Sequence, residues 1–407
     1  MEIDKRKNSF YLSKKAFIIY LILVFISIII KIPFLFYFYK YGYIPRDFNV
    51  LNNDCYYYVQ HAINHDINYF TFGDHWLYEY INSLVYTFTQ NPDLVYLYMS
   101  ILNIILSSLL PLIFIPAIHS LIQDKQKKDR CFIILTTLIL FWPTAIFLSV
   151  QNFKDIILAL LVSLFITIYL SNKEKLHFKH LLVLILLTYL LYSLRTYLAA
   201  ILIITTLLHF IITKKSVRTI IIVSICLLLF YLSPIWNNIQ NFMDLTNNWL
   251  FNQQALEIYN TTLIAQGSPP MELYNTPITF LYGFVRSIFN PLPTLIIDQP
   301  YNYLLCCRSI ILSFLLLFFI IQLKKWHGSI KIWLLCIMLI QLCFYAYNPT
   351  FSGPRQLFPG VDLLFIFMIS YLLVQRRTNS ILILSFGTGL ILTSIFLVFT
   401  SRTWLIF

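Results

Sequence analysis

The stretch AFIIYLILVFISIIIKIPFLFYF, residues 16–38, decides the class of this chain. It meets the length of roughly 20 apolar residues that a helix needs to cross the hydrocarbon core of a membrane. The basic residues that precede it are Lys5, Arg6, Lys7, Lys14 and Lys15. The run is too long for the core of a signal peptide and has no small-residue cleavage site, so we expect it to remain as the first membrane span.

Similar apolar runs continue to the end of the chain, and we predict about eleven spans in a single membrane domain covering residues 1–407. The runs are 16–38, 94–121, 131–150, 156–171, 180–195, 197–213, 219–233, 303–322, 329–347, 357–374 and 380–399. The composition agrees, because 59% of the residues are hydrophobic and only 11% are charged. A soluble domain carries about 25% charged residues. The predicted fold class is therefore an all-α polytopic membrane protein.

Lysine and arginine cluster in alternate gaps between these runs. Together with the N-terminal group, about 20 of the 29 basic residues fall on one side of the membrane, which the positive-inside rule makes cytoplasmic. The clusters in the gaps are Lys125, Lys127, Lys128, Arg130; Lys173, Lys175, Lys179; Lys214, Lys215, Arg218; Lys324, Lys325, Lys331; and Arg376, Arg377. The N-terminus is therefore predicted to be cytoplasmic. The net charge of +12 belongs to these loops, and no nucleic-acid partner is expected.

The opposite, outer side carries the two long loops, residues 39–93 and 234–302. Both contain partly apolar stretches, at 76–90 and 277–289. We predict helices that lie in the interface plane of the membrane there, with ordinary loop helices packed on the bundle as the alternative. Loops on a rigid scaffold often carry function, so this side is the place to look for a site.

Several cations on the outer side run against the positive-inside trend. They are Lys154, Arg195, Arg286, Arg308 and Arg355. Arginine binds phosphate through a planar two-pronged fork, and a diphosphate leaving group needs such partners as its charge develops. We favour anion binding for the set. The alternatives are snorkelling at the interface, an internal pair of Lys154 with Asp155, and a structural pair of Asp362 with Arg308 or Arg355.

Asp54 lies early in the first outer loop, where a helix is expected to begin. Tyr57, Tyr58 and His61 follow it at helical spacing. A carboxylate just outside the membrane can act as a general base toward a hydroxyl. The alternative is that Asp54 merely caps the helix.

The same loop contains candidate ligands for a divalent metal, at His61, His65, Asp66, Asp74 and His75. The spacing of these residues is generic, and ordinary polar loop residues are the favoured interpretation. No cofactor is therefore certain.

A set of motifs resembles a known family. The motifs are Asp54…Tyr58…Ala62, the amphipathic stretch Trp76–Phe88, Asn91-Pro92 leading into a span with Asn103, Phe141-Trp142-Pro143, Phe153-Lys154-Asp155 and the turn Gly353–Pro359. The pattern, mainly over residues 16–215, resembles the polytopic GT-C glycosyltransferases, which use polyprenyl-phosphate-linked sugars, and related membrane proteins of bacterial capsule and O-antigen gene clusters. Many relatives show a paired acid, whereas Asp54 has Asn53 and Cys55 as neighbours.

The resemblance implies a GT-C-like fold with Asp54 as the catalytic base. It implies that Lys154, Arg195 and Arg355 hold the lipid phosphate of the donor, and we add Arg286 from the cation set. Further substrate-binding candidates are Tyr57, Tyr58, His61, Asp155 and Arg308.

The expected function is an inverting transfer of a sugar from an undecaprenyl-phosphate-linked donor to a glycan or lipid acceptor. It would occur on the outer face of a bacterial inner membrane, in cell-surface polysaccharide synthesis. The alternatives are a repeat-unit polymerase of capsule or O-antigen, and a non-enzymatic flippase or transporter of a lipid-linked sugar. The chain has only 9 glycines and no clear internal repeat, which argues against a transporter.

Overall fold

The computed structural model describes most of the chain as α-helix. The described residues are 12–41, 54–64, 75–172, 177–214, 277–289, 300–324, 326, 328–347, 354–375 and 389. Their helices are α1 Lys14–Tyr41, α2 Asp54–Asn64, α3 Trp76–Thr89, α4 Pro92–Ile113, α5 Ile115–Leu121, α6 Lys125–Phe141, α7 Pro143–Ser149, α8 Asp155–Asn172, α9 Phe178–Leu194, α10 Thr196–Lys214, α14 Pro277–Phe289, α15 Pro300–Leu323, α16 Ser329–Tyr347, α17 Pro354–Leu357, the π-helix η3 Phe358–Asp362, and α18 Leu363–Gln375.

The chain is a polytopic helical membrane protein, but the predicted total of eleven spans is not confirmed. Within the described residues, six helices are long and apolar enough to cross a membrane, or seven if the bent pair α6 and α7 forms one span. The helices α9 and α10 match predicted runs but are shorter apolar helices. The predicted runs 219–233 and 380–399 lie outside the described residues.

Local sequence signals explain where several helices begin and break. Asn91 caps α4, because its side-chain oxygen accepts from the backbone N–H of Asp93 at 2.9 Å, and Pro92 occupies the first helical turn. Trp142 has an extended backbone ahead of Pro143, and α6 and α7 meet there at a bend of 58°. A proline disfavours helical geometry in the residue before it, which accounts for this break.

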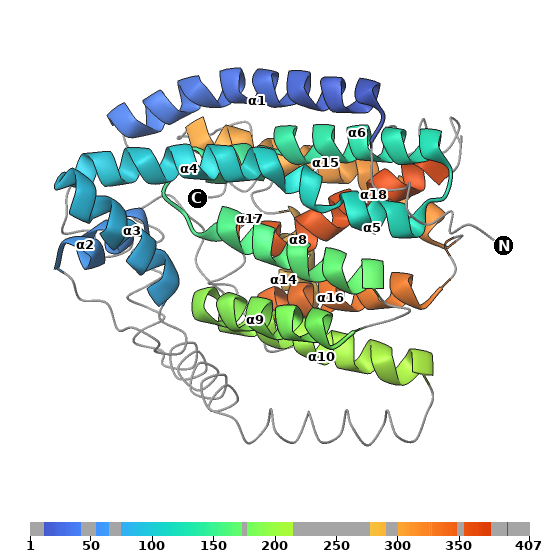
Figure 1. Ribbon diagram of the computed structural model, residues 1–407. Coiled ribbons are helices and arrows are strands. Elements are labelled where there is room, and N and C mark those ends of the chain that lie inside the picture. The colour runs from blue at the N-terminus through green and yellow to red at the C-terminus, as the bar shows by residue number, and fades with distance from the viewer. Residues whose placement is uncertain are drawn as a thin grey trace, which may run out of the picture.

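The helices lie side by side, as Figure 1 shows. The first helix, α1, runs along α4 and α6 at one edge of the bundle, while α9 and α10 form the opposite edge. The short helices α2 and α3 pack together at one end, which we call the α2–α3 end. The other end, where α1 and α6 begin with Lys14 and Lys125, we call the basic end.

The surface of α1 is apolar and its buried face is partly polar. Side chains such as Phe25 (65% exposed) and Phe36 (62% exposed) face outward, whereas Ser27 and Lys31 are buried. The Lys31 ammonium donates to the hydroxyl of Ser107 on α4 at 2.8 Å. A long exposed apolar face of this kind is a surface for lipid rather than for water.

The helix α3 has the same inverted pattern. Its polar residues Glu79 and Asn82 are buried, whereas Leu84 and Phe88 are exposed. The stretches 76–90 and 277–289, which the sequence predicts to be helical, form α3 and α14. The apolar outer face of α3 agrees with a helix that rests against the membrane interface while its polar side faces the bundle.

Candidate functional site

Polar side chains from α3 and α4 hold the turn between α7 and α8. The Asn103 amide on α4 donates to the carbonyl oxygens of Gln151 at 2.8 Å and Phe153 at 2.9 Å. From α3, the Tyr78 hydroxyl donates to Oδ1 of Asn152 at 2.7 Å. All of these groups are buried, where an unmet hydrogen bond is costly. The turn is therefore fixed relative to both α3 and α4.

Lys154 ends this turn and is buried, with 3% of its surface exposed. Its ammonium lies over the ring of Tyr58 on α2, 5.8 Å from the ring centroid. A cation at this distance is attracted by the negative face of the ring, more strongly when water is excluded. Tyr58 is itself held edge-on by Tyr78, with ring centroids 4.8 Å apart. The helix α2 thus contacts the α7–α8 turn through Tyr58.

Arg195 occupies the junction of α9 and α10, where its extended backbone separates the two helices. Its Nη2 forms an ion pair with Oδ1 of Asp155 at 2.9 Å, and both side chains are buried. Asp155 therefore pairs across helices with Arg195. An internal pair of Lys154 with Asp155 is one of the alternatives that the sequence leaves open.

Further groups surround the Arg195 guanidinium. It lies 5.8 Å from the ring centroid of Tyr197, and its Nη1 donates to the carbonyl oxygen of Gln356 at 3.5 Å. The Tyr345 hydroxyl donates to the same carbonyl oxygen at 2.9 Å and is hydrogen-bonded to the Tyr197 hydroxyl. The α9–α10 junction is thereby tied to α16 and α17.

The predicted base, Asp54, is the first residue of α2, and its side chain lies outside the described part of the chain. One helical turn later, Tyr58 contacts Lys154. Tyr57 is 41% exposed and stacks on His61, with ring centroids 4.1 Å apart. The first half of α2 therefore contacts the cation of the α7–α8 turn through Tyr58.

His61 also approaches a carboxylate that the sequence analysis did not single out. Its Nδ1 lies 3.8 Å from Oε2 of Glu79, which is buried on α3. The sequence does carry a pattern that indicates an inward-facing Glu79. Trp76, Glu79, Asn82 and Ser83 are spaced to share one face of a helix, and all four lie on the buried face of α3. The face was overlooked because polar residues on an amphipathic helix usually point outward.

Arg308 contacts a different set of residues from Lys154 and Arg195. Its Nε and Nη2 each donate to the Asp362 carboxylate at 2.6 Å, and its Nη1 donates to the Ile288 carbonyl oxygen at 2.7 Å. The Trp142 indole donates to the same carboxylate at 2.9 Å. Of the pairings left open for Asp362, the one with Arg308 is found. It ties α15 to η3 and to the α6–α7 break.

For the remaining predicted cations, the structure describes the backbone but not the side chain. Arg286 lies on α14 and Arg355 on α17, next to Gln356, and both side chains lie outside the described part. Of the candidate metal ligands, His65, Asp66 and Asp74 also lie outside the described part of the chain. In the portion of the chain that is described, no group of three or more His, Cys, Asp or Glu could hold a metal ion.

His75 connects the start of α3 to the end of α9, a role that is not evident from the sequence. Its backbone is left-handed (φ 59°, ψ 13°), which is uncommon for a residue other than glycine. Its Nδ1 lies 3.1 Å from the carbonyl oxygen of Leu194, the last residue of α9. The start of α3 is therefore joined to the residue that precedes Arg195.

The fold and the site define a helical membrane protein with a buried cationic cluster at the α2–α3 end. No protein-family model, no curated protein and no solved structure matches the chain. The chemistry of the cluster has to be argued from its residues.

Proposed function

We propose that the chain is a membrane glycosyltransferase that uses a polyprenyl-phosphate-linked sugar as donor. The observation that carries the proposal is that Lys154 lies over Tyr58 of α2, the helix that begins at Asp54, while the neighbouring Asp155 pairs with Arg195. The site contains two cations, Lys154 and Arg195, and the Asp155 carboxylate pairs with Arg195. Lysine and arginine are side chains that bind phosphate, including a lipid phosphate.

The proposed reaction needs one base and one anion-binding group. The Asp54 carboxylate takes the proton of the acceptor hydroxyl, and the acceptor oxygen attacks the anomeric carbon of the donor sugar. The bond between that carbon and the phosphate oxygen breaks with inversion, and the polyprenyl phosphate leaves with the bonding electrons. Lys154 and Arg195 stabilise the negative charge that develops on the leaving phosphate.

The position of the cluster suits a donor that stays in the membrane. The apolar outer faces of α1 and α3 can accompany the polyprenyl chain, whereas the cations at the α2–α3 end meet the phosphate. Arg286 and Arg355 are proposed as additional phosphate contacts, since α17 carries Arg355 beside the carbonyl oxygen that Arg195 contacts.

The test is the Asp54→Asn variant in cells whose surface glycan depends on the chain. We expect glycan formation to fall by about 10²–10⁴-fold, the usual contribution of a general base, with unchanged protein in the membrane. Asp93→Asn is the matched control, since Asp93 is an exposed carboxylate in the first turn of α4 at the same end. Wild-type glycan from Asp54→Asn would remove Asp54 from the mechanism.

Donor binding is tested separately with purified protein and polyprenyl phosphate, the proposed leaving product. We expect Lys154→Gln to weaken the thermal stabilisation that this lipid produces. The control Lys40→Gln removes an exposed cation from the end of α1 and should have little effect. Equal losses in both variants would indicate a diffuse surface charge instead of a site.

A further inference from the structure

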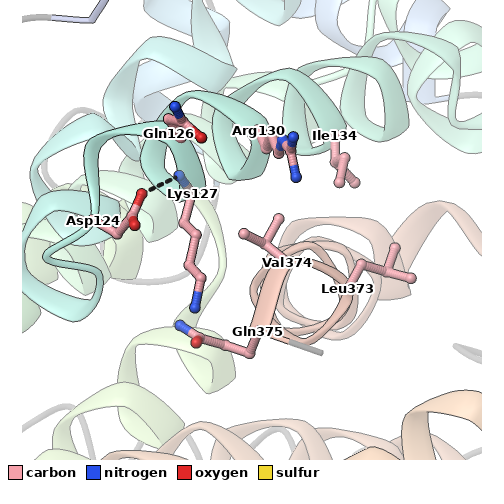
Figure 2. A pocket seen from close by; sticks show the side chains of 8 residues that line it. All are labelled: Asp124, Gln126, Lys127, Arg130, Ile134, Leu373, Val374 and Gln375. Atoms are coloured by element: carbon pink, nitrogen blue, oxygen red, sulfur yellow. Dashed lines mark hydrogen bonds between the residues drawn. The ribbon is translucent and has the colours of Figure 1, made fainter. Parts of the chain in front are cut away.

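A second charged cavity lies at the basic end, between the beginning of α6 and the end of α18 (Figure 2). Its volume is about 320 Å³. Polar side chains from both helices line it, and Lys127 and Gln375 extend toward each other across the gap. This cavity is far along the bundle from the α2–α3 end, so the proposed glycosyl transfer does not use it.

The polar wall of the cavity is positively charged. Lys127 and Arg130 line it from α6, together with Asp124. Asp124 is the N-cap of α6, and its carboxylate already accepts from the backbone N–H of Lys127 at 2.9 Å. Neither Lys127 nor Arg130 forms an ion pair with a described residue.

Lys127 lies in the first turn of α6, where the helix dipole is unfavourable to a cation. The first turn of α6 holds no acidic residue, and the positive end of a helix dipole repels lysine and arginine. An anion between α6 and α18 would offset that repulsion, because it would meet both Lys127 and Arg130.

The other wall of the cavity is apolar. Ile134 on α6 and Leu373 and Val374 on α18 line it. A free inorganic anion gains nothing from such a wall, whereas a lipid brings a phosphate and a hydrocarbon chain together. Basic pockets between membrane helices are a known kind of site for anionic lipid headgroups.

We propose that this cavity binds the phosphate headgroup of an anionic membrane lipid, with Lys127 and Arg130 holding the phosphate and the Ile134–Leu373–Val374 wall holding the first part of an acyl chain. The lipid then bridges α6 and α18, which line the two sides of the cavity.

The experiment is native mass spectrometry of the detergent-purified full chain with added phosphatidylglycerol. We expect a single bound lipid in the wild type and roughly 30-fold weaker binding in Lys127→Gln/Arg130→Gln, since two cations that contact the headgroup are lost. The matched control is Lys125→Gln/Lys128→Gln, which removes two charges from the same turn of α6 without touching the cavity lining. Salt screens those more distant charges, so the control should bind like the wild type.

Two further arms keep the result decisive. The charge-preserving variant Lys127→Arg/Arg130→Lys should retain the lipid, which separates loss of charge from loss of folding. Inorganic phosphate is expected not to displace phosphatidylglycerol at millimolar concentration. Equal loss of lipid in both glutamine double variants, or full displacement by inorganic phosphate, would overturn the proposal.

Discussion

Arg308 and Asp362 are buried together, and each would be costly if left alone. The two-pronged contact of the guanidinium with the carboxylate, at 2.6 Å for both bonds, satisfies the charges in a site with almost no solvent exposure. Removing one partner of such a pair leaves an uncompensated charge, whereas replacing both by apolar residues is often tolerated. The pair is therefore a structural connection between α15 and η3.

We predict that Arg308→Ala lowers the free energy of unfolding by about 3–5 kcal/mol. Arg308→Lys should be milder because a positive charge remains, although the fork geometry is lost. The double variant Arg308→Met/Asp362→Leu should recover part of the loss, because no buried charge remains, although the Trp142 indole and the Ile288 carbonyl oxygen lose these bonds. Thermal unfolding in detergent measures all three. A double variant as unstable as the sum of the single changes would contradict this account.

The π-helix η3 packs closely against α16 at Gly360. A Cβ atom on Gly360 would lie 1.8 Å from Oε1 of Gln341, and Gln341 is fully buried. A π-helical segment inside a longer helix widens the turn locally and is common at functional sites. Here it continues from α17, which contacts Arg195, to the Asp362 that pairs with Arg308.

Gly360→Ala is expected to destabilise the protein by about 1–3 kcal/mol, the usual effect of overpacking. In a Gln341→Ala background the same change should cost much less, because the colliding amide is gone. A thermal-unfolding double-mutant cycle measures this coupling. Additive effects of the two substitutions would show that the contact does not constrain η3.

The molecule as a whole has two chemically different ends. At the basic end α1 and α6 begin with lysines, and at the α2–α3 end the buried cluster of Lys154, Arg195 and Asp155 is assembled. We propose, on the positive-inside rule, that the basic end faces the cytoplasm. The proposed site would then face outward.

This sidedness predicts which exposed positions react with a membrane-impermeant maleimide in intact cells. In a cysteine-free background, Asp93→Cys at the start of α4 should be labelled, and Lys125→Cys at the start of α6 should react only after the cells are opened. Both positions are exposed at helix beginnings, so they are matched in accessibility. The reverse labelling pattern would invert the orientation and move the proposed chemistry to the cytoplasm.

The helices of the described bundle could be predicted from the sequence because their signals are local. A span depends on about 20 consecutive apolar residues. The boundaries at Asn91-Pro92 and at Trp142-Pro143 depend on a few neighbouring residues. The predicted number of eleven spans is not confirmed, since short helices such as α9 can pack within a bundle without meeting the length of a full span.

The partners of the buried charges were decided by the tertiary structure. Asp155 pairs with Arg195 although Lys154 is its neighbour in the chain, and Glu79 turns inward toward His61. Helical periodicity places a side chain on a face, but the packing of several helices determines what that face meets. In a dry interior each charge needs a partner, so the three-dimensional packing selects which one it gets.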